Sequence, residues 1–449
     1  MKNRREEMLS IPVEKLICSL ALPTILGMLA TAVYSMTDTF FIGMLEDASL
    51  VAAVGIVFYF MSLVQAVGFL FGYGSGNYIA RCIGREDKEG ALRMAAAGVI
   101  FAVGTGLAIM GTAYAFLPEL VRLLGGGVSV ELKDACRDML SVFLSGVPGM
   151  TGALCLYNQL RLQGDAGSAI LGMGIGMGLN MVLDPVFIFG FHMGISGAAL
   201  ATVTGQYAGL AALWMISFKG ERIPVNPKYF IIDGTILREL FCGGSPNFLR
   251  QSITTFAGIL LNHVAGAYGE TVIAAFTVTN RITAMLTAGV VGFGQGYQSV
   301  CAVNFGARRM DRVKRGFRFC VTVATVVLTL GAACGIIFAP LMVGLFAKEE
   351  SVCLLGIKIL RYECLAFPMM GYTTVAGMFL QNIGRFGRAA MVTSLRQGIL
   401  FIPLLILLPR LAGLKGVILV QPIADFLAFP IAFMLTTRQL KSFMYEGAP

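Results

Sequence analysis

Apolar residues form long, almost uninterrupted runs along the whole chain, and short polar segments separate these runs. A run of roughly 20 apolar residues can cross the ~30 Å hydrocarbon core of a bilayer as one helix. Breaks at charges, prolines and glycine clusters predict twelve transmembrane helices, over residues 15–43, 52–81, 92–117, 134–160, 168–190, 194–217, 236–266, 271–302, 314–346, 353–381, 388–409 and 413–436. We therefore expect an all-α polytopic membrane protein.

Composition agrees with this pattern. Of the 449 residues, 57% are hydrophobic and only 13% are charged, whereas a soluble domain usually has about 25% charged residues. The formal charge of +9 does not indicate a nucleic-acid partner, because the basic residues occupy short loops instead of one amphipathic face. The ten cysteines lack metal-ligand spacing and mostly lie in apolar spans, as small buried hydrophobic residues do.

Glycine is abundant, with 55 residues, and some of it recurs at every second position, as at Gly172, Gly174, Gly176 and Gly178. In water so much glycine would weaken helices. In lipid, small residues let helix backbones approach closely, and this packing supplies the cohesion between helices.

The distribution of Lys and Arg predicts the orientation. These residues gather in segments that fall on the same side as the N-terminus, among them 81–93, 308–318 and 385–396, and few lie in the opposite segments. Because cytoplasmic loops carry the excess of positive charge, we expect both termini in the cytoplasm and the chain in the plasma (inner) membrane.

The second half of the chain repeats the order of motifs in the first. Pro23 is matched by Pro246, "GYGSG" (72–76) by "GFGQG" (292–296), "GDAG" (164–167) by "GRFG" (384–387), and "GISGAALA" (194–201) by "GLKGVILV" (413–420). Each half has an even number of spans, so both halves enter the membrane from the same side. Such parallel repeats are related by a pseudo-two-fold axis along the membrane normal, which is typical of transporters.

This repeat defines the expected domains. Residues 1–218 form an N-lobe of six helices, the polar segment 219–235 is a cytoplasmic linker, and residues 236–449 form a C-lobe of six helices. Two similar bundles across a cleft can expose that cleft to alternate sides of the membrane.

Two acids lie within the predicted spans of the first half, and ionisable side chains at membrane depth are functional candidates by default. At 1.5 Å per residue, Asp38 and Asp184 lie roughly 8 Å and 9 Å below the outer ends of their helices, and Thr202 lies roughly 12 Å deep in the next one. Asn180 shares a helix face with Asp184 at spacing i, i+4. The four side chains reach a similar level of one bundle.

Their chemistry suits a small cation. Carboxylate, amide and hydroxyl oxygens are hard ligands, appropriate for Na⁺, and two acids that approach each other favour the binding of a proton. Pro185 follows Asp184 directly and frees a backbone carbonyl that can join the ligands. Simpler explanations remain open: Asp38 as a buried structural acid, Asp184-Pro185 as a plain kink, and Thr202 as a packing residue.

The second half departs from this pattern. Leu261 occupies the position that matches Asp38, and "LFIPLL" (400–405) has no acid where the first half has Asp184. An acid with a purely architectural role would be expected in both halves. Asp425 is the one deep acid we identify there, with Arg250 and Arg281 as candidate partners; all three are candidates for substrate or proton handling.

One helix face of the first half is rich in methionine. Met173, Met177 and Met181 fall on nearly one stripe, beside Asn180 and Asp184. Core packing explains this stripe, and so does a cleft wall that accepts varied apolar ligands through flexible, polarisable thioethers.

Several segments together resemble the multidrug and toxic compound extrusion (MATE) family, in its MepA-like and DinF-like bacterial branches. They are "SMTDTFFIG" (35–43), "GSGNYIARCIGRED" (74–87), "GLNMVLDPVFIFGF" (178–191) and "GISGAALATVTGQ" (194–206). The resemblance implies a V-shaped pair of six-helix bundles that exports drugs in exchange for H⁺ or Na⁺. It also places the family's N-lobe cation site on Asp38, Asn180, Asp184 and Thr202, with helix bending at Pro23.

We therefore expect a monomeric secondary antiporter that exports amphipathic, often cationic small molecules, with no cofactor beyond the coupling ion. A flippase for lipid-linked oligosaccharides is the alternative within the same superfamily, and it requires a cationic cleft, for which only Arg250 and Arg281 are deep enough. An enzyme is not expected, because the two His residues and the Ser and Cys residues form no catalytic or metal-binding pattern.

Overall fold

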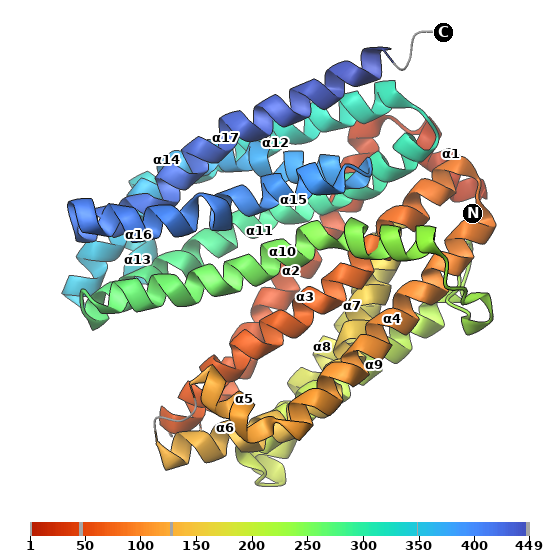
Figure 1. Cartoon of the computed structure of the whole chain (residues 1–449). Coiled ribbons are helices and arrows are strands. Elements are labelled where there is room, and N and C mark those ends of the chain that lie inside the picture. Colours follow the sequence, from red (N-terminus) through yellow and green to blue (C-terminus); the bar gives the residue numbers. More distant parts are fainter. Residues whose placement is uncertain (1, 45–47, 126–128, 348, 446–449) are drawn as a thin grey trace. The chain divides into compact units, whose positions relative to one another are not determined.

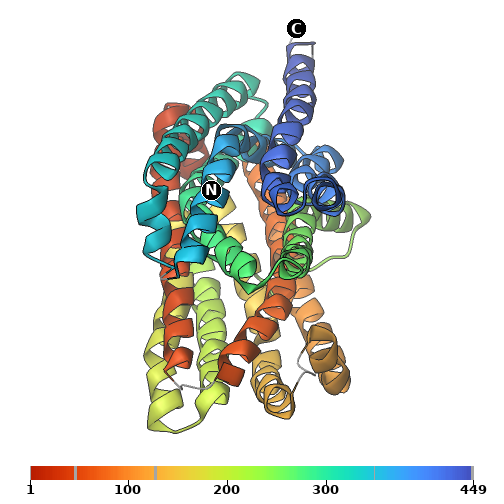
Figure 2. The same ribbon diagram turned by 90° about the vertical axis from the view of Figure 1, so that its left-hand side faces the viewer.

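The computed structural model describes residues 2–44, 48–125, 129–347 and 349–445, without the side chains of some residues inside the helices, Asp38 among them. This part of the chain is helical and contains no strand (Figure 1 and Figure 2). Its first half contains α1 (Lys2–Ser10), α2 (Val13–Gly43), α3 (Ala48–Arg85), α4 (Lys88–Ala115), α5 (Leu117–Leu124), α6 (Val130–Phe143), η1 (Leu144–Gly146), α7 (Val147–Leu162), α8 (Ala166–Pro185), η2 (Val186–Gly190) and α9 (Gly194–Ser217).

After the short helix η3 (Pro227–Tyr229) the order of elements is repeated. The second half contains α10 (Gly234–Gly266), α11 (Glu270–Gly306), α12 (Met310–Ile337), α13 (Ala339–Gly344), α14 (Glu350–Asn382), α15 (Phe386–Ser394), η4 (Leu395–Ile399), α16 (Phe401–Ala412) and α17 (Leu414–Tyr445). Among the described residues, ten helices are long and apolar enough to cross a membrane. The two other predicted spans, α10 and α14, are each 33 residues long but contain no equally apolar stretch.

Two predicted spans end earlier than the hydrophobic pattern suggests, and each is followed by a short separate helix. The breaks fall at Phe116, between α4 and α5, and at Phe338, between α12 and α13. In both places a proline, Pro118 or Pro340, stands within the first two positions of the short helix. Proline is favoured at a helix start but cannot continue a preceding helix, so the apolar run is divided.

The chain forms two compact units whose boundaries lie inside helices. Unit 1 contains Met1–Ser10 and Leu26–Gln251, and unit 2 contains Ile11–Ile25 and Ser252–Pro449. The first part of α2 thus belongs to unit 2, and the first part of α10 to unit 1. The sequence analysis predicted an N-lobe that ends at residue 218 and a C-lobe that begins at residue 236. The two compact units differ from these lobes in the first parts of α2 and α10, and the lobe boundaries stay a prediction.

In unit 1, the first part of α10 packs directly on α3. A Cβ atom on Gly244 would lie 1.7 Å from the Leu70 carbonyl oxygen, and one on Gly74 would lie 2.0 Å from the Leu240 carbonyl oxygen. Only glycine allows backbones to approach so closely. The buried guanidinium of Arg81 adds an ion pair to Glu239 of α10, with 2.5 Å between Nη2 and Oε2.

In unit 2, the first part of α2 packs on α11 in the same way. A Cβ on Gly296 would lie 2.6 Å from the Ala21 nitrogen, and one on Gly292 would lie 2.9 Å from the Ile25 Cα. The buried hydroxyl of Thr24, next to Pro23, lies 2.7 Å from the Gly292 carbonyl oxygen. The matching motifs "GYGSG" and "GFGQG" therefore have one structural role, which is to accept a helix segment at backbone distance.

One end of unit 1 is held together by ion pairs around the turn between α7 and α8. Asp165 Oδ2 lies 2.5 Å from Arg222 Nε of the linker and 3.4 Å from Arg4 Nη1 of α1. Asp165 Oδ1 also accepts a hydrogen bond from the Ser168 backbone N–H at the start of α8. Although burial opposes ionisation of Asp165, the charges of Arg4 and Arg222 outweigh it, and the pKa of this carboxyl lies below its usual value.

The lowered pKa predicts how stability depends on pH. The stabilisation by Asp165 is complete above the unfolded pKa of about 3.9 and is lost as the pH falls through the lower folded pKa. We expect Asp165→Asn, which preserves the helix cap, to lower the melting temperature at neutral pH by roughly 1 °C for about 1 kcal/mol in a chain of this length, with a smaller difference at acidic pH.

Asp87→Asn provides the control in thermal unfolding of the purified protein. Asp87 caps α4 by accepting a hydrogen bond from the Gly90 N–H at 2.8 Å, and no ion pair to it is found among the described residues. An equal destabilisation by both substitutions at neutral pH would contradict the role of the Asp165 ion pairs.

Candidate functional site

Three of the four predicted cation-site residues meet in unit 1. The Asn180 side-chain amide donates to Asp184 Oδ1 and to Thr202 Oγ1, each at 3.3 Å, and the Thr202 hydroxyl donates to the Ala198 carbonyl oxygen of its own helix at 3.0 Å. All three side chains are buried, and Asp184 is 0% exposed. The side chain of the fourth residue, Asp38 of α2, lies outside the described residues.

The close packing of α8 on α9 brings these side chains together. A Cβ on Gly176 would lie 2.4 Å from the Gly205 carbonyl oxygen, and a Cβ on Gly205 would lie 2.6 Å from the Gly176 carbonyl oxygen. Gly174 and Gly178, in contrast, face open space. Asn180 lies one helical turn after Gly176. Because the two helices are so close at Gly176, the Asn180 amide lies within hydrogen-bond distance of Thr202.

The helix geometry changes directly after Asp184. Pro185 ends the regular part of α8, and the π-helical turn η2 follows over Val186–Gly190. Proline has no N–H to donate into the preceding turn, and π-turns within helices are frequent at functional sites. The acid thus stands at a local break in the backbone hydrogen bonding.

One oxygen in this cluster has no partner in the structure. Asn180 Oδ1 is buried and accepts no hydrogen bond from the part of the chain that the structure describes. A buried carbonyl oxygen without a donor is costly. It belongs to the amide whose nitrogen donates to Asp184 Oδ1, so a cation or a proton donor bound near this carboxylate would give Asn180 Oδ1 a partner.

Asp425 is also buried, but its partner differs from the two that the sequence suggested. Its Oδ1 atom lies 2.5 Å from Arg396 Nε of η4 and accepts a hydrogen bond from Gln421 Nε2 at 3.1 Å. Arg281 is exposed, and Arg250 belongs to unit 1, whereas Asp425 belongs to unit 2. The sequence analysis counted Arg396 with the basic residues of the inner segment 385–396, although the predicted span 388–409 includes it; in the structure it lies in η4, where Asp425 neutralises its charge.

Glu363 of α14 was missed by the sequence analysis. Its side chain is buried in unit 2 and interacts electrostatically with Asp425 and Arg396. The expectation that Asp425 is the one deep acid of the second half is therefore wrong. The signal was present in the sequence, since Glu363 lies between apolar residues inside the predicted span 353–381.

Comparison with known proteins agrees with this architecture. A profile of the MatE family matches residues 23–186 and 246–407, one match in each half of the chain. The chain belongs to the MatE family. It is similar to the multidrug export protein MepA of Staphylococcus aureus (strain MRSA252), with 28% identity over 435 residues that cover 95% of each chain.

Solved MatE-type structures have the same fold. A MOP superfamily transporter from Pyrococcus furiosus, described as having a binding pocket of reversed polarity that suggests a different function, has 26% identity and a TM-score of 0.90 over 98% of each chain. A MATE in its bent conformation has 25% identity and a TM-score of 0.92 over 99% of each chain. The protein is thus a multi-pass membrane protein and a multidrug efflux transporter with twelve spans in two bundles.

The methionine stripe of this MatE chain lies on α8, and its residues are half-buried. Met173 packs against the apolar core of unit 1, in which Phe143, Leu144 and Val147 are fully buried. The Met177 sulfur lies 4.0 Å from the Thr31 hydroxyl of α2. Packing within unit 1 therefore accounts for Met173 and Met177, and lining of a substrate path stays a prediction for the stripe.

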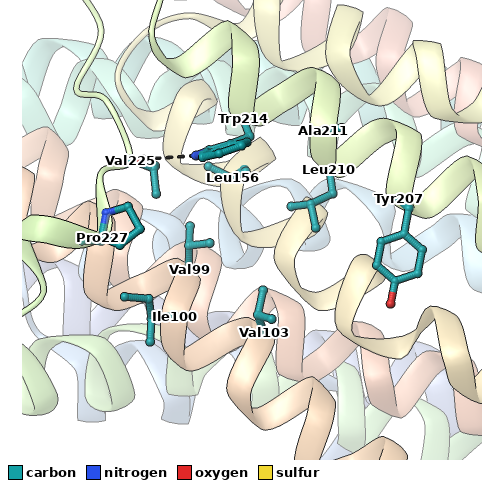
Figure 3. A pocket seen from close by; sticks show the side chains of 11 residues that line it. Val99, Ile100, Val103, Leu156, Tyr207, Leu210, Ala211, Trp214, Val225 and Pro227 are labelled. Atoms are coloured by element: carbon teal, nitrogen blue, oxygen red, sulfur yellow. Dashed lines mark hydrogen bonds between the residues drawn. The ribbon is translucent and has the colours of Figure 1, made fainter.

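Unit 1 also contains an apolar pocket of about 490 Å³ that none of the predicted site residues lines. It lies between α4, α7, α9 and the linker (Figure 3), and the Trp214 indole N–H donates to the Val225 carbonyl oxygen at its edge. No charged residue lines this pocket, so it offers no ligand for the coupling ion.

The backbone contact between α8 and α9 generates a prediction. Gly176→Ala places a methyl group against a backbone carbonyl that cannot rotate away, so the helices must separate and the Asn180–Thr202 hydrogen bond is weakened. We expect a loss of about 1–3 kcal/mol in stability together with reduced drug efflux. Gly178→Ala, two residues further along the same helix, faces open space and should retain efflux and melting temperature. Equal behaviour of the two variants in efflux and thermal unfolding would contradict this account.

Proposed function

We propose that this transporter exports amphipathic, often cationic small molecules from the cytoplasm in exchange for H⁺ or Na⁺, bound by Asp38, Asn180, Asp184 and Thr202. The orphan Asn180 Oδ1 beside the buried Asp184 carboxylate is the observation that carries this proposal. The known export of drugs by the similar MepA proteins supports the direction and the class of substrate.

The proposed ligand set fits either ion. An ionised carboxylate in an apolar bundle is expensive, and a proton or a cation removes that cost. The available oxygens of Asp184, Asn180 and Thr202 are hard donors, as Na⁺ requires. Because one charge that crosses 100 mV releases about 2.3 kcal/mol, the entry of one ion supplies substantial energy for drug export.

The position of Asp38 connects ion binding to the movement of the transporter. Asp38 lies on α2, whose first part, with Pro23, packs in unit 2, while the part from Leu26 onward packs in unit 1. An ion that Asp38 shares with Asp184 would change the forces on a helix common to both units. We propose that α2 bends near Pro23 when the ion binds and that this change expels the substrate.

The proposed orientation places both termini in the cytoplasm of a plasma-membrane protein that works as a single chain. The turn around Asp165, the linker residue Arg222 and Arg4 of α1 contact each other in unit 1. These basic segments share one end of the unit, and positive charge is enriched in cytoplasmic segments. The flippase alternative is not favoured, because the similar proteins are multidrug exporters.

The test is transport by Asp184→Asn and Asp38→Asn variants in everted vesicles, with pH and Na⁺ varied independently. We expect each variant to lose drug accumulation at least about tenfold, equivalent to about 1.4 kcal/mol, because an amide binds neither a proton nor Na⁺ as the carboxylate does. Asp138→Asn, which changes an exposed acid of α6, should transport normally.

Sensitivity to a protonophore would identify H⁺ as the coupling ion, and sensitivity to Na⁺ removal would identify Na⁺. Na⁺ binding should also raise the melting temperature, since a ligand at 100 times its Kd stabilises by about 2.7 kcal/mol, and Asp184→Asn should abolish that increase. Drug accumulation that survives both protonophore and Na⁺ removal would refute the proposed antiport.

A further inference from the structure

Unit 2 contains a buried group of three charged side chains that the proposed coupling site does not use. Glu363 comes from α14, Arg396 from the π-turn η4, and Asp425 from α17. Glu363 is 8% exposed and Asp425 is 3% exposed. Counted along the helix axes, Glu363 lies roughly 20 Å from the start of α14 and Asp425 roughly 16 Å from the start of α17. Both acids are thus far from the helix ends.

The three groups are not equivalent. Asp425 has an ion pair with Arg396 and a hydrogen bond from Gln421. The Glu363 carboxyl, in contrast, makes no hydrogen bond or ion pair with any described residue, although it lies close enough to interact electrostatically with both Asp425 and Arg396. The Cys364 thiol, the next residue of α14, also interacts electrostatically with Glu363.

Charge balance decides the state of this group. One guanidinium neutralises one carboxylate, so full ionisation would leave one uncompensated negative charge in an apolar bundle, at a cost of several kcal/mol. We propose that Glu363, Arg396 and Asp425 form a proton-binding site in the C-terminal half, with the exchangeable proton on Glu363. This inference does not depend on the coupling site proposed in unit 1.

A proton fits this site better than a metal ion does. The described residues contain no group of three or more His, Cys, Asp or Glu side chains that could hold a metal. Arg396 already occupies an oxygen of Asp425, and its positive charge repels a second cation nearby. A proton requires a single carboxyl oxygen and no coordination shell.

Local geometry also distinguishes this group from a simple structural ion pair. Arg396 lies in a π-turn inside the span formed by α15, η4 and α16, and π-turns of this kind are frequent at functional sites. A structural ion pair would need only Arg396 and Asp425. The second acid adds a charge that only proton uptake neutralises.

Infrared spectroscopy of the purified protein can count the protonated carboxyl groups through their C=O stretch. Glu363→Gln should remove one such group relative to the unmodified protein. Asp425→Asn should also remove one, because Arg396 then neutralises an ionised Glu363. Arg396→Gln should add one, because two acids then lack a cation. Glu350→Gln, which changes an exposed acid at the start of the same helix, is the matched control and should change nothing.

The outcome depends on pH as well as on the variants. The Glu363 signal should disappear reversibly as the pH is raised within the range from about 5 to about 9, above the ordinary Glu pKa. The proposal would be overturned if neither Glu363→Gln nor Asp425→Asn removed a protonated-carboxyl band. It would also be overturned if only one of the two variants removed that band. A signal that is constant across this range would identify a permanently protonated structural acid and would equally overturn it. Asp184→Asn should leave the Glu363 signal unchanged, which separates this test from that of the coupling site.

Discussion

The cost of an ionisable side chain inside an apolar helix bundle governs both charged clusters of this protein. Such a group persists only where hydrogen bonds, an opposite charge, a bound ion or a proton compensates it. In unit 1, Asp184 accepts a hydrogen bond from the neutral Asn180 amide, which also donates to Thr202; this amide stabilises a carboxylate without cancelling its charge. Unit 2 places Arg396 on Asp425, which cancels the charge. The first arrangement is the one for which we propose a cation, and the second the one for which we propose only the proton of an additional acid.

Close backbone contacts at glycine position these clusters and also define the two units. Helices in lipid gain little from the hydrophobic effect and depend on packing. Gly74 and Gly244 join α3 to the first part of α10, and Gly292 and Gly296 join α11 to the first part of α2. The unit boundaries at residues 25/26 and 251/252 each follow a helix proline, Pro23 or Pro246, by a few residues. A helix weakened by proline is a suitable place for the chain to change from one packed body to another.

Hydropathy was sufficient to predict the twelve spans, because each must bury about 20 residues in hydrocarbon. Helix depth was sufficient to predict the meeting of Asn180, Asp184 and Thr202, since α8 and α9 are adjacent, antiparallel and short-linked. The breaks at Phe116 and Phe338 were not predicted, because the apolar run continues through them. The sequence also did not predict that the first part of α2 packs in unit 2 and the first part of α10 in unit 1. A glycine motif indicates a close helix contact but does not identify the helix that packs against it.

The charged residues of the second half were harder to predict, and the reason is physical. Arg396 was counted with a basic inner segment and no partner was predicted for it, because its neutralisation depends on Asp425, 29 residues away in the chain. Glu363 was overlooked although the predicted span 353–381 contains it, because its proximity to Asp425 and Arg396 depends on the fold. Pairing between distant residues decides both cases, and a single sequence without the fold does not contain that information.

The sequence repeat explains why the two halves acquired different chemistry. In the alignment of "GDAG" with "GRFG", Gly176 corresponds to Arg396, and in that of "GISGAALA" with "GLKGVILV", Thr202 and Gln206 correspond to Gln421 and Asp425. In unit 1, Gly176 has no side chain, so the backbones of α8 and α9 are in contact there. One turn further along, only the small neutral side chains of Asn180 and Thr202 fit between the two helices. In unit 2 a long cationic side chain occupies the same position and reaches an acid on the next span. One position on the fifth helix of each repeat therefore determines whether the neighbouring helices meet through backbone or through an ion pair.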